Sequence, residues 1–140
     1  MNLRQPGLHL FFKRPNAAGL TSVLQEGSAV ESALQPTGVA GLSVLTSGPT
    51  PVDPGGLVES AQLRELIQVL AAKFDVMLID SPPVLDVHDA VVLAGMCDSC
   101  ASVLELGRET RRTLETGQTR LKQAGIKPIG VVLNKYRPEF

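Results

Sequence analysis

Asp80 and Ser81 are the residues best placed for chemistry, because they follow a short apolar run at residues 76–79 and precede a pair of prolines. Such a run is typical of a strand buried on both faces of a parallel sheet, and the prolines end it because they lack the N–H that a ladder needs. Ligands bind beyond the carboxyl ends of such strands. Asp80 is therefore predicted to hold a metal ion beside a phosphate. The alternative is a carboxylate that caps the turn before the prolines. Ser81 would lie near the metal or serve the turn.

The elements that would position Asp80 alternate between strands and helices. Strands are predicted at the apolar runs 42–45, 76–79, 101–106 and 129–133. Helices are predicted at 63–74 after the N-cap residue Ser60, at 89–94, and at 109–124 before Gly125. Two short helices at 20–24 and 30–34, and a loop at 49–56, complete the pattern. This alternation predicts an α/β fold with a doubly wound, mainly parallel sheet in a three-layer α/β/α arrangement.

The composition limits the classes of protein to which the chain can belong. Its 140 residues, 44% hydrophobic and 19% charged, suit one globular domain. The formal net charge of −1 gives no electrostatic argument for binding nucleic acid or an anionic membrane. No apolar run approaches the roughly 18 residues of a membrane span. The N-terminal residues do not resemble a signal peptide, so a cytoplasmic protein is expected.

Cys97 and Cys100 form a C-x-x-C pair, and they are the two cysteines of the chain. A zinc site needs two further ligands, which His9 and His88 do not supply at the usual spacing. A redox pair needs its first cysteine at a helix N-terminus, whereas Cys97 follows an apolar run. A structural role for two reduced cysteines is therefore favoured over metal or redox chemistry.

Several pieces of the sequence recur together in one known family. In chain order they are Leu3–Pro6, Leu8–His9, Pro15–Asn16, Gly19–Leu20, Leu42–Leu45, Gly48–Pro49, Leu78–Leu85, Asp89–Ala90 and Gly130–Asn134. Taken in this order, the pieces resemble the bacterial tyrosine kinases of the capsular and exopolysaccharide family, which are relatives of the Min/Par ATPases. The resemblance implies a P-loop NTPase-like fold that uses ATP and Mg²⁺. Asp80 then matches the Walker B aspartate, a catalytic residue and metal ligand.

The same resemblance implies roles for three further residues. Asn2 stands where the family's second phosphate-binding motif, Walker A′, has a catalytic aspartate; an amide can bind a metal-bound water but cannot act as a base. Arg4 would contact a phosphate or a neighbouring subunit, or pair on the surface. Asn134 would read the adenine edge of the nucleotide, or form a strand-end turn. Asp89 matches a family Asp-Ala pair and is either a site residue or the N-cap of a helix.

The chain contains no G-x-x-x-x-G-K-S/T motif, the Walker A loop that cradles the β- and γ-phosphates. Residues 1–140 are therefore predicted to be a partial P-loop domain, truncated at the N-terminus and beginning within the Walker A′ segment. The resemblance implies that the Walker A strand is central and lies between the strands at 76–79 and 101–106, so its loss would leave unpaired edges on both. The isolated chain would then be marginally stable, or these two strands would pair with each other.

The resemblance also implies a function for the parent protein. It would be an autokinase that transfers the γ-phosphoryl group of ATP to tyrosine and regulates exopolysaccharide chain length and export. Its partner would be a membrane polysaccharide co-polymerase, and it would form homo-oligomers at the inner face of the cell membrane. The chain alone is expected to be inactive. One alternative is a non-catalytic interaction module of the same fold. Another is a Min/Par-type ATPase in which Cys97 and Cys100 hold a metal cluster between subunits.

Overall fold

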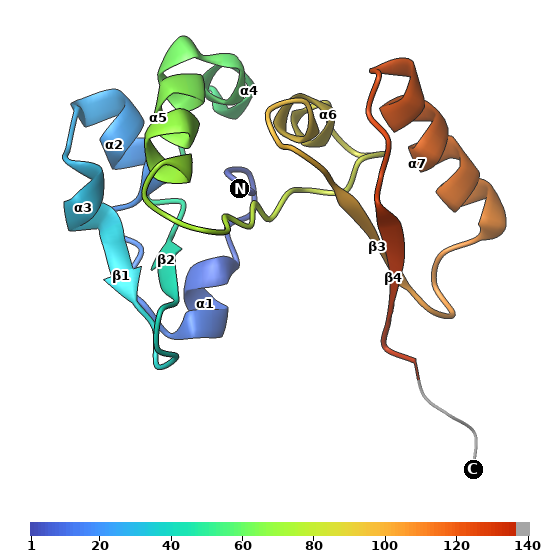
Figure 1. The fold of residues 1–140 in the computed structure, drawn as a ribbon, viewed down its shortest axis with the longest axis horizontal. Helices are drawn as coiled ribbons and strands as arrows, with labels where there is room; N and C mark the ends of the chain where they lie inside the picture. The colour runs from blue at the N-terminus through green and yellow to red at the C-terminus, as the bar shows by residue number, and fades with distance from the viewer. Residues whose placement is uncertain (137–140) are drawn as a thin grey trace. The chain divides into compact units, whose positions relative to one another are not determined.

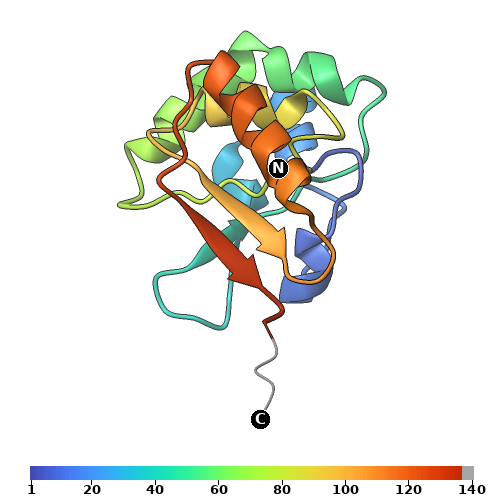
Figure 2. The same ribbon diagram turned by 90° about the vertical axis from the view of Figure 1, so that its right-hand side faces the viewer.

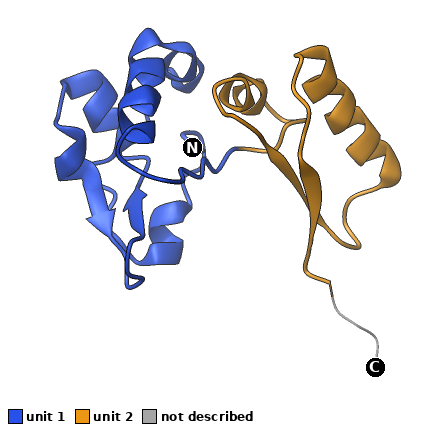
Figure 3. Ribbon diagram, in the orientation of Figure 1, with its two compact units in different colours: residues 1–81 blue, residues 82–140 orange. Residues whose placement is uncertain are grey.

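A computed structural model describes residues 1–136, and its contacts divide the chain into two compact units, residues 1–81 and residues 82–140 (Figure 3). The first unit holds α1 (Leu8–Phe12), α2 (Leu20–Glu26), α3 (Val30–Ala33), β1 (Leu34–Pro36), β2 (Ser43–Leu45), α4 (Pro54–Glu59) and α5 (Ala61–Ala71). The second unit holds α6 (Asp89–Ala94), β3 (Ala101–Glu105), α7 (Arg111–Gln123) and β4 (Gly130–Asn134) (Figure 1).

The second unit contains a βαβ motif. Strands β3 and β4 pair in parallel, with Ala101 opposite Gly130 and Glu105 opposite Asn134. Helix α7 connects them and lies along one face of the pair (Figures 1 and 2). The hydroxyl of Thr110 caps the start of α7 by accepting a hydrogen bond from the backbone N–H of Thr113, and Gly125 follows its end in the left-handed conformation. The predicted strands and helix are confirmed here, with their parallel order.

Helix α5 confirms the predicted amphipathic helix of the first unit. Leu63, Ile67 and Leu70 are buried along one face, at the spacing that the sequence shows. Its N-cap is Ser60, whose hydroxyl accepts a hydrogen bond from the N–H of Leu63 at 3.2 Å and donates one to the carbonyl of Leu57 at 2.7 Å. The same hydroxyl therefore joins the end of α4 to the start of α5.

Replacing Ser60 with alanine is expected to lower the free energy of unfolding by about 1 kcal/mol, because the N–H of Leu63 loses its cap. Urea unfolding followed by circular dichroism measures the change. Ser99→Ala, at an exposed serine outside the helices, is the matched control and should leave the stability within about 0.5 kcal/mol of the parent. Equal stability of all three proteins would show that the cap contributes nothing.

Two short elements of the first unit differ from the predictions. The helix predicted at 30–34 ends at Ala33, because Leu34 takes an extended backbone and begins β1, which pairs antiparallel with β2. The loop predicted at 49–56 gives way to α4 from Pro54 onward. Asp53 caps this helix by accepting from the N–H of Gly56, and proline at the first helical position needs no hydrogen-bond partner.

The prediction of a strand at residues 76–79 is wrong. These residues are not assigned to a strand, and no ladder partner pairs with them among residues 1–136. The side chains of Val76 and Leu78 are 76% and 90% exposed. The pairing of this run with residues 101–106 stays a prediction, because the run and β3 belong to different units and β4 occupies one edge of β3. An apolar run signals burial, but a strand also requires a neighbour that supplies hydrogen bonds.

Each unit has apolar side chains in its interior. In the first unit these include Leu3, Val58 and Leu63, which are almost completely buried, and in the second unit Leu93 and Leu121. In the part of the chain that the structure describes, the helices are too short or too polar to cross a lipid bilayer.

Candidate functional site

Asp80 is exposed, and its carboxylate makes no hydrogen bond or ion pair with any residue in the range 1–136. The interpretation of Asp80 as a cap of the following turn therefore has no bond to support it. No three potential metal ligands gather anywhere in the described range. Mg²⁺ is commonly held by one or two carboxylates together with waters and substrate phosphates. A single unengaged carboxylate such as Asp80 suits this mode of binding, whereas a site built wholly from protein ligands is not present in the described range.

Asn2 and Arg4 lie in the segment before α1. The side-chain oxygen of Asn2 accepts a hydrogen bond from the N–H of Gln5 at 2.9 Å, so this amide closes a local turn. The carbonyl of Asn2 accepts a hydrogen bond from the hydroxyl of Ser47 at 3.3 Å. Arg4 is exposed, and a Cβ atom added at Gly55 would lie 3.5 Å from its guanidinium, which places Arg4 beside the start of α4. No hydrogen bond joins either residue to Asp80.

A tight backbone crossing supports this part of the first unit. The side-chain amide of Asn16 donates to the carbonyl of Gly48 at 2.8 Å and accepts from the N–H of Gly48 at 2.9 Å. A Cβ atom at Gly19 would lie 2.4 Å from the backbone nitrogen of Gly48 and 2.5 Å from the carbonyl oxygen of Thr46. Asn16, Gly19 and Gly48 are among the residues that carry the family resemblance, but the sequence alone gives them no role. The structure shows that they lock the loop after β2 onto the segment before α2.

Asp89 does not cap α6, so one of its two predicted roles is wrong. The N-cap residue is His88, and Asp89 is the first residue of the helix, where it is buried. An acidic residue in the first turn also interacts favourably with the helix dipole. Ser81, the neighbour of Asp80, is exposed, as is Asp86.

Asn134 lies at the end of β4, in the second unit. Its side-chain oxygen accepts a hydrogen bond from the N–H of Lys135 at 2.9 Å, and Lys135 has a left-handed backbone with φ of 56°. This is the geometry of a strand-end turn, one of the two predicted roles. The ammonium of Lys135 donates to Glu105 at 2.8 Å and holds the pKa of that carboxyl below its usual range. The adenine-reading role of Asn134 stays a prediction.

Cys97 lies after the C-terminal end of α6, where its thiol donates to the carbonyl of Leu93 at 3.3 Å. Burial, helped by the nearby charge of Asp98, raises the pKa of this thiol. A helix C-terminus also disfavours a thiolate, since its dipole presents negative charge. Cys97 therefore lacks the environment of a redox nucleophile, and both cysteines are free thiols.

We expect Cys97 to react slowly with iodoacetamide in the native chain, because its raised pKa leaves little thiolate near neutral pH. Alkylation followed by peptide mass spectrometry gives the rate at this residue. In urea the burial is lost, and the rate should rise several-fold. Equal rates in the native and unfolded chains would contradict the assignment of Cys97 as a half-buried structural thiol.

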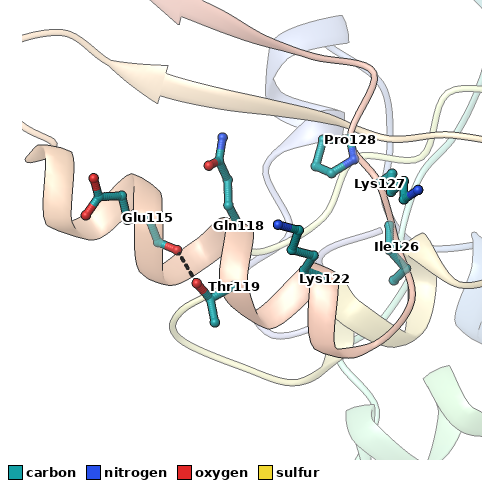
Figure 4. Close-up of a pocket in the computed structure, with 7 residues that line it drawn as sticks. All are labelled: Glu115, Gln118, Thr119, Lys122, Ile126, Lys127 and Pro128. Atoms are coloured by element: carbon teal, nitrogen blue, oxygen red, sulfur yellow. Dashed lines mark hydrogen bonds between the residues drawn. The ribbon is translucent and has the colours of Figure 1, made fainter.

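A shallow groove lies elsewhere in the second unit, between the second half of α7 and the segment that follows it (Figure 4). It is lined by Glu115, Gln118, Thr119, Lys122, Ile126, Lys127 and Pro128. None of the predicted site residues is among them, so the groove does not belong to the candidate site. Of the predicted residues, Asn2, Arg4, Asp80 and Ser81 lie in the first unit and Asn134 in the second.

No protein-family model matches the chain. The sequence is 35% identical over 133 residues to the tyrosine-protein kinase YwqD of Bacillus subtilis, covering 95% of this chain and 56% of that protein. It is 32% identical over 134 residues to the putative tyrosine-protein kinase CapB of Staphylococcus aureus, covering 96% and 59%. The chain thus spans somewhat more than half the length of these relatives.

Solved structures give the same result. The structure of the chimerical protein CapA2B2 matches with a TM-score of 0.93 at 31% identity, over 98% of this chain and 61% of that one. The kinase domain of Escherichia coli tyrosine kinase ETK matches with a TM-score of 0.85 at 27% identity, over 99% and 56%. These matches confirm the predicted α/β fold of the P-loop type. Over nearly all of its own length, this chain resembles part of the bacterial tyrosine kinases in sequence and in backbone.

Proposed function

We propose that this chain forms part of an ATP-dependent protein-tyrosine kinase and supplies the carboxylate that holds Mg²⁺ during phosphoryl transfer. The observation that carries the proposal is the match to tyrosine-protein kinases over 95% of the chain, at 35% identity. The unengaged, exposed carboxylate of Asp80 agrees with it. Residues 1–140 would then be a partial P-loop domain.

Four residues of the chain would have separate roles in phosphoryl transfer. Asp80 would bind Mg²⁺ through an oxygen or through a metal-bound water, and Mg²⁺ neutralises the charge that develops on the phosphates. Asn2 would orient a water but could not accept a proton from tyrosine, because an amide is not a base. The Asn2 oxygen is also engaged by Gln5. Arg4 would approach a phosphate, and Asn134 the adenine.

The cradle for the β- and γ-phosphates is the part that these 140 residues do not encode, since they contain no Walker A sequence. We therefore expect the purified chain, incubated with radiolabelled ATP and Mg²⁺, to incorporate no phosphate into tyrosine. The longest open reading frame that contains the chain should encode the motif upstream, and its product should label itself on tyrosine. Phosphorylation of the 140-residue chain on tyrosine at ordinary kinase rates would contradict the proposal that the chain lacks the phosphate-binding loop.

The wider role also follows from the family resemblance. We propose that the intact kinase acts at the cytoplasmic face of the cell membrane, as a homo-oligomer, with a membrane polysaccharide co-polymerase. There it would regulate the chain length and export of an exopolysaccharide. Loss of the gene should then alter the length distribution of surface polysaccharide on a gel.

A second candidate is a non-catalytic interaction module of the same fold, which the absence of a Walker A motif from the 140 residues favours. A genuine translation start at Met1, with no P-loop encoded upstream, would support this candidate. The Min/Par-type ATPase with a metal cluster has less support, because Cys97 lies at a helix C-terminus with a raised pKa. Iron and zinc analysis of the purified protein tests that alternative.

A further inference from the structure

Helix α1 presents two large apolar side chains to solvent. Leu10 is 71% exposed and Phe11 is 80% exposed, and no residue of this helix is buried. The ring of Phe11 meets the edge of Phe12, with ring centroids 5.1 Å apart and an interplanar angle of 82°. Leu10 and Phe11 are adjacent in the sequence, so helix α1 carries two neighbouring apolar side chains that the described residues leave exposed.

Two cations follow this apolar pair directly. The C-cap residue of α1 is Lys13, which has a left-handed backbone and donates its N–H to the carbonyl of Leu10 at 3.2 Å. The N–H of Arg14 donates to the carbonyl of His9 at 2.9 Å. The chain therefore folds back over the end of α1, and these hydrogen bonds keep both cations next to the exposed helix.

The charged side chains of the segment that contains α1, residues 1–25, are all basic. Neither Lys13 nor Arg14 forms an ion pair with a carboxylate among residues 1–136. The first acidic residue of the chain is Glu26, so the segment before it contains Arg4, Lys13 and Arg14 and no carboxylate side chain. The net charge of −1 is the sum of this basic segment and the rest of the chain, which is acidic overall. The whole-chain value therefore conceals a local excess of basic residues near the N-terminus.

We propose that α1, Lys13 and Arg14 form a surface that docks on anionic phospholipid. Leu10 and Phe11 would enter the boundary between headgroups and acyl chains, while the two cations pair with lipid phosphates. A specific protein partner is less suited to this surface. Such an interface buries about 800 Å² on each side with close shape complementarity, far more than two side chains of one helical turn offer. The proposal is independent of kinase activity and of the location inferred from the family.

Vesicle sedimentation with the purified 140-residue chain tests the proposal. The chain should sediment with vesicles of phosphatidylcholine and phosphatidylglycerol, and much less with phosphatidylcholine alone. Phe11→Ala should weaken binding by about tenfold, because the largest inserted side chain is lost. Lys13→Asn should weaken it by about fivefold, because one cation near the surface is lost. Asparagine tolerates the left-handed backbone of this position.

Val52→Ala is the matched control, because Val52 is a fully exposed apolar residue far from α1 in sequence and next to Asp53. It should bind as the parent does, and far-ultraviolet circular dichroism should show the same fold for all variants. Equal binding of the parent and Phe11→Ala would overturn the proposal. So would a dimer in size-exclusion chromatography that Phe11→Ala converts to a monomer, without any binding to vesicles, because the occupant of the surface would then be a second copy.

Discussion

Gly19→Ala is expected to lower the free energy of unfolding by about 3 kcal/mol, a severe loss for a domain of this size. The new methyl carbon would lie 2.4 Å from the backbone nitrogen of Gly48, 2.5 Å from the carbonyl oxygen of Thr46 and 2.8 Å from the carbonyl carbon of Ser47. All three are backbone atoms, so no side-chain rotation relieves the overlap. Urea unfolding followed by circular dichroism gives the loss.

The physical cause of this loss is the crossing of two backbone segments. The N–H groups of Leu20 and Thr21 donate to the carbonyls of Thr46 and Ser47, both at 2.9 Å. Moving the segments apart to admit a methyl group would lengthen these hydrogen bonds. Buried backbone groups that lose a hydrogen bond are not compensated by water, so the folded state would lose stability.

Gly38→Ala is the matched control for this prediction. No heavy atom lies within 4 Å of a Cβ at Gly38, and its backbone is not left-handed. Its stability should stay within about 1 kcal/mol of the parent, and a small gain is reasonable because alanine restricts the unfolded chain. If both variants lost the same stability, the crossing at Gly19 would not be tight in solution.

The parts of the fold that follow from local sequence were predicted well. Helix α5 has an apolar stripe after its N-cap residue Ser60, and α7 is a polar helix that ends before Gly125, so the signals of both helices are local. Strands β3 and β4 are apolar runs with a helix between them, and such a helical crossover is the usual connection between parallel strands.

The elements that the sequence did not predict depend on distant partners. Strand β1 is three residues long and exists because β2 pairs with it. Helix α4 begins at Asp53 and Pro54, but the surrounding prolines and glycines resemble a loop. Residues 76–79 illustrate the opposite case, since their apolar character predicts a strand and no described residue supplies the ladder.

The sequence points to Asp80 as a candidate site residue, but it does not reveal the contacts around the candidate residues. Asp80 follows from an apolar run that ends in a carboxylate before two prolines, and the structure leaves this carboxylate unengaged. The Asn16–Gly48 pair could not be foreseen, because the two residues are 32 positions apart and no local pattern links them. The hydrogen bond from the N–H of Gln5 to the side-chain oxygen of Asn2 was also not predicted from the sequence.

Asp80→Asn is expected to lower tyrosine autophosphorylation by about 100-fold or more in the kinase encoded by the reading frame that contains this chain. The substitution keeps the shape of the side chain and removes the charge that attracts Mg²⁺. Because the carboxylate has no partner among the described residues, its loss should leave the stability within about 0.5 kcal/mol of the parent. A raised Mg²⁺ concentration should restore part of the rate.

Asp75→Asn is the matched control for Asp80→Asn, because Asp75 is an exposed carboxylate just before the same apolar run. The most direct measurement is the rate of phosphotyrosine formation in the parent, Asp80→Asn and Asp75→Asn kinases, with ATP and Mg²⁺. We predict that the parent and Asp75→Asn rates agree and that the Asp80→Asn rate falls by about two orders of magnitude. An Asp80→Asn rate equal to that of the parent, or a parent product with no phosphotyrosine, would contradict the assignment of this chain to the phosphoryl-transfer site.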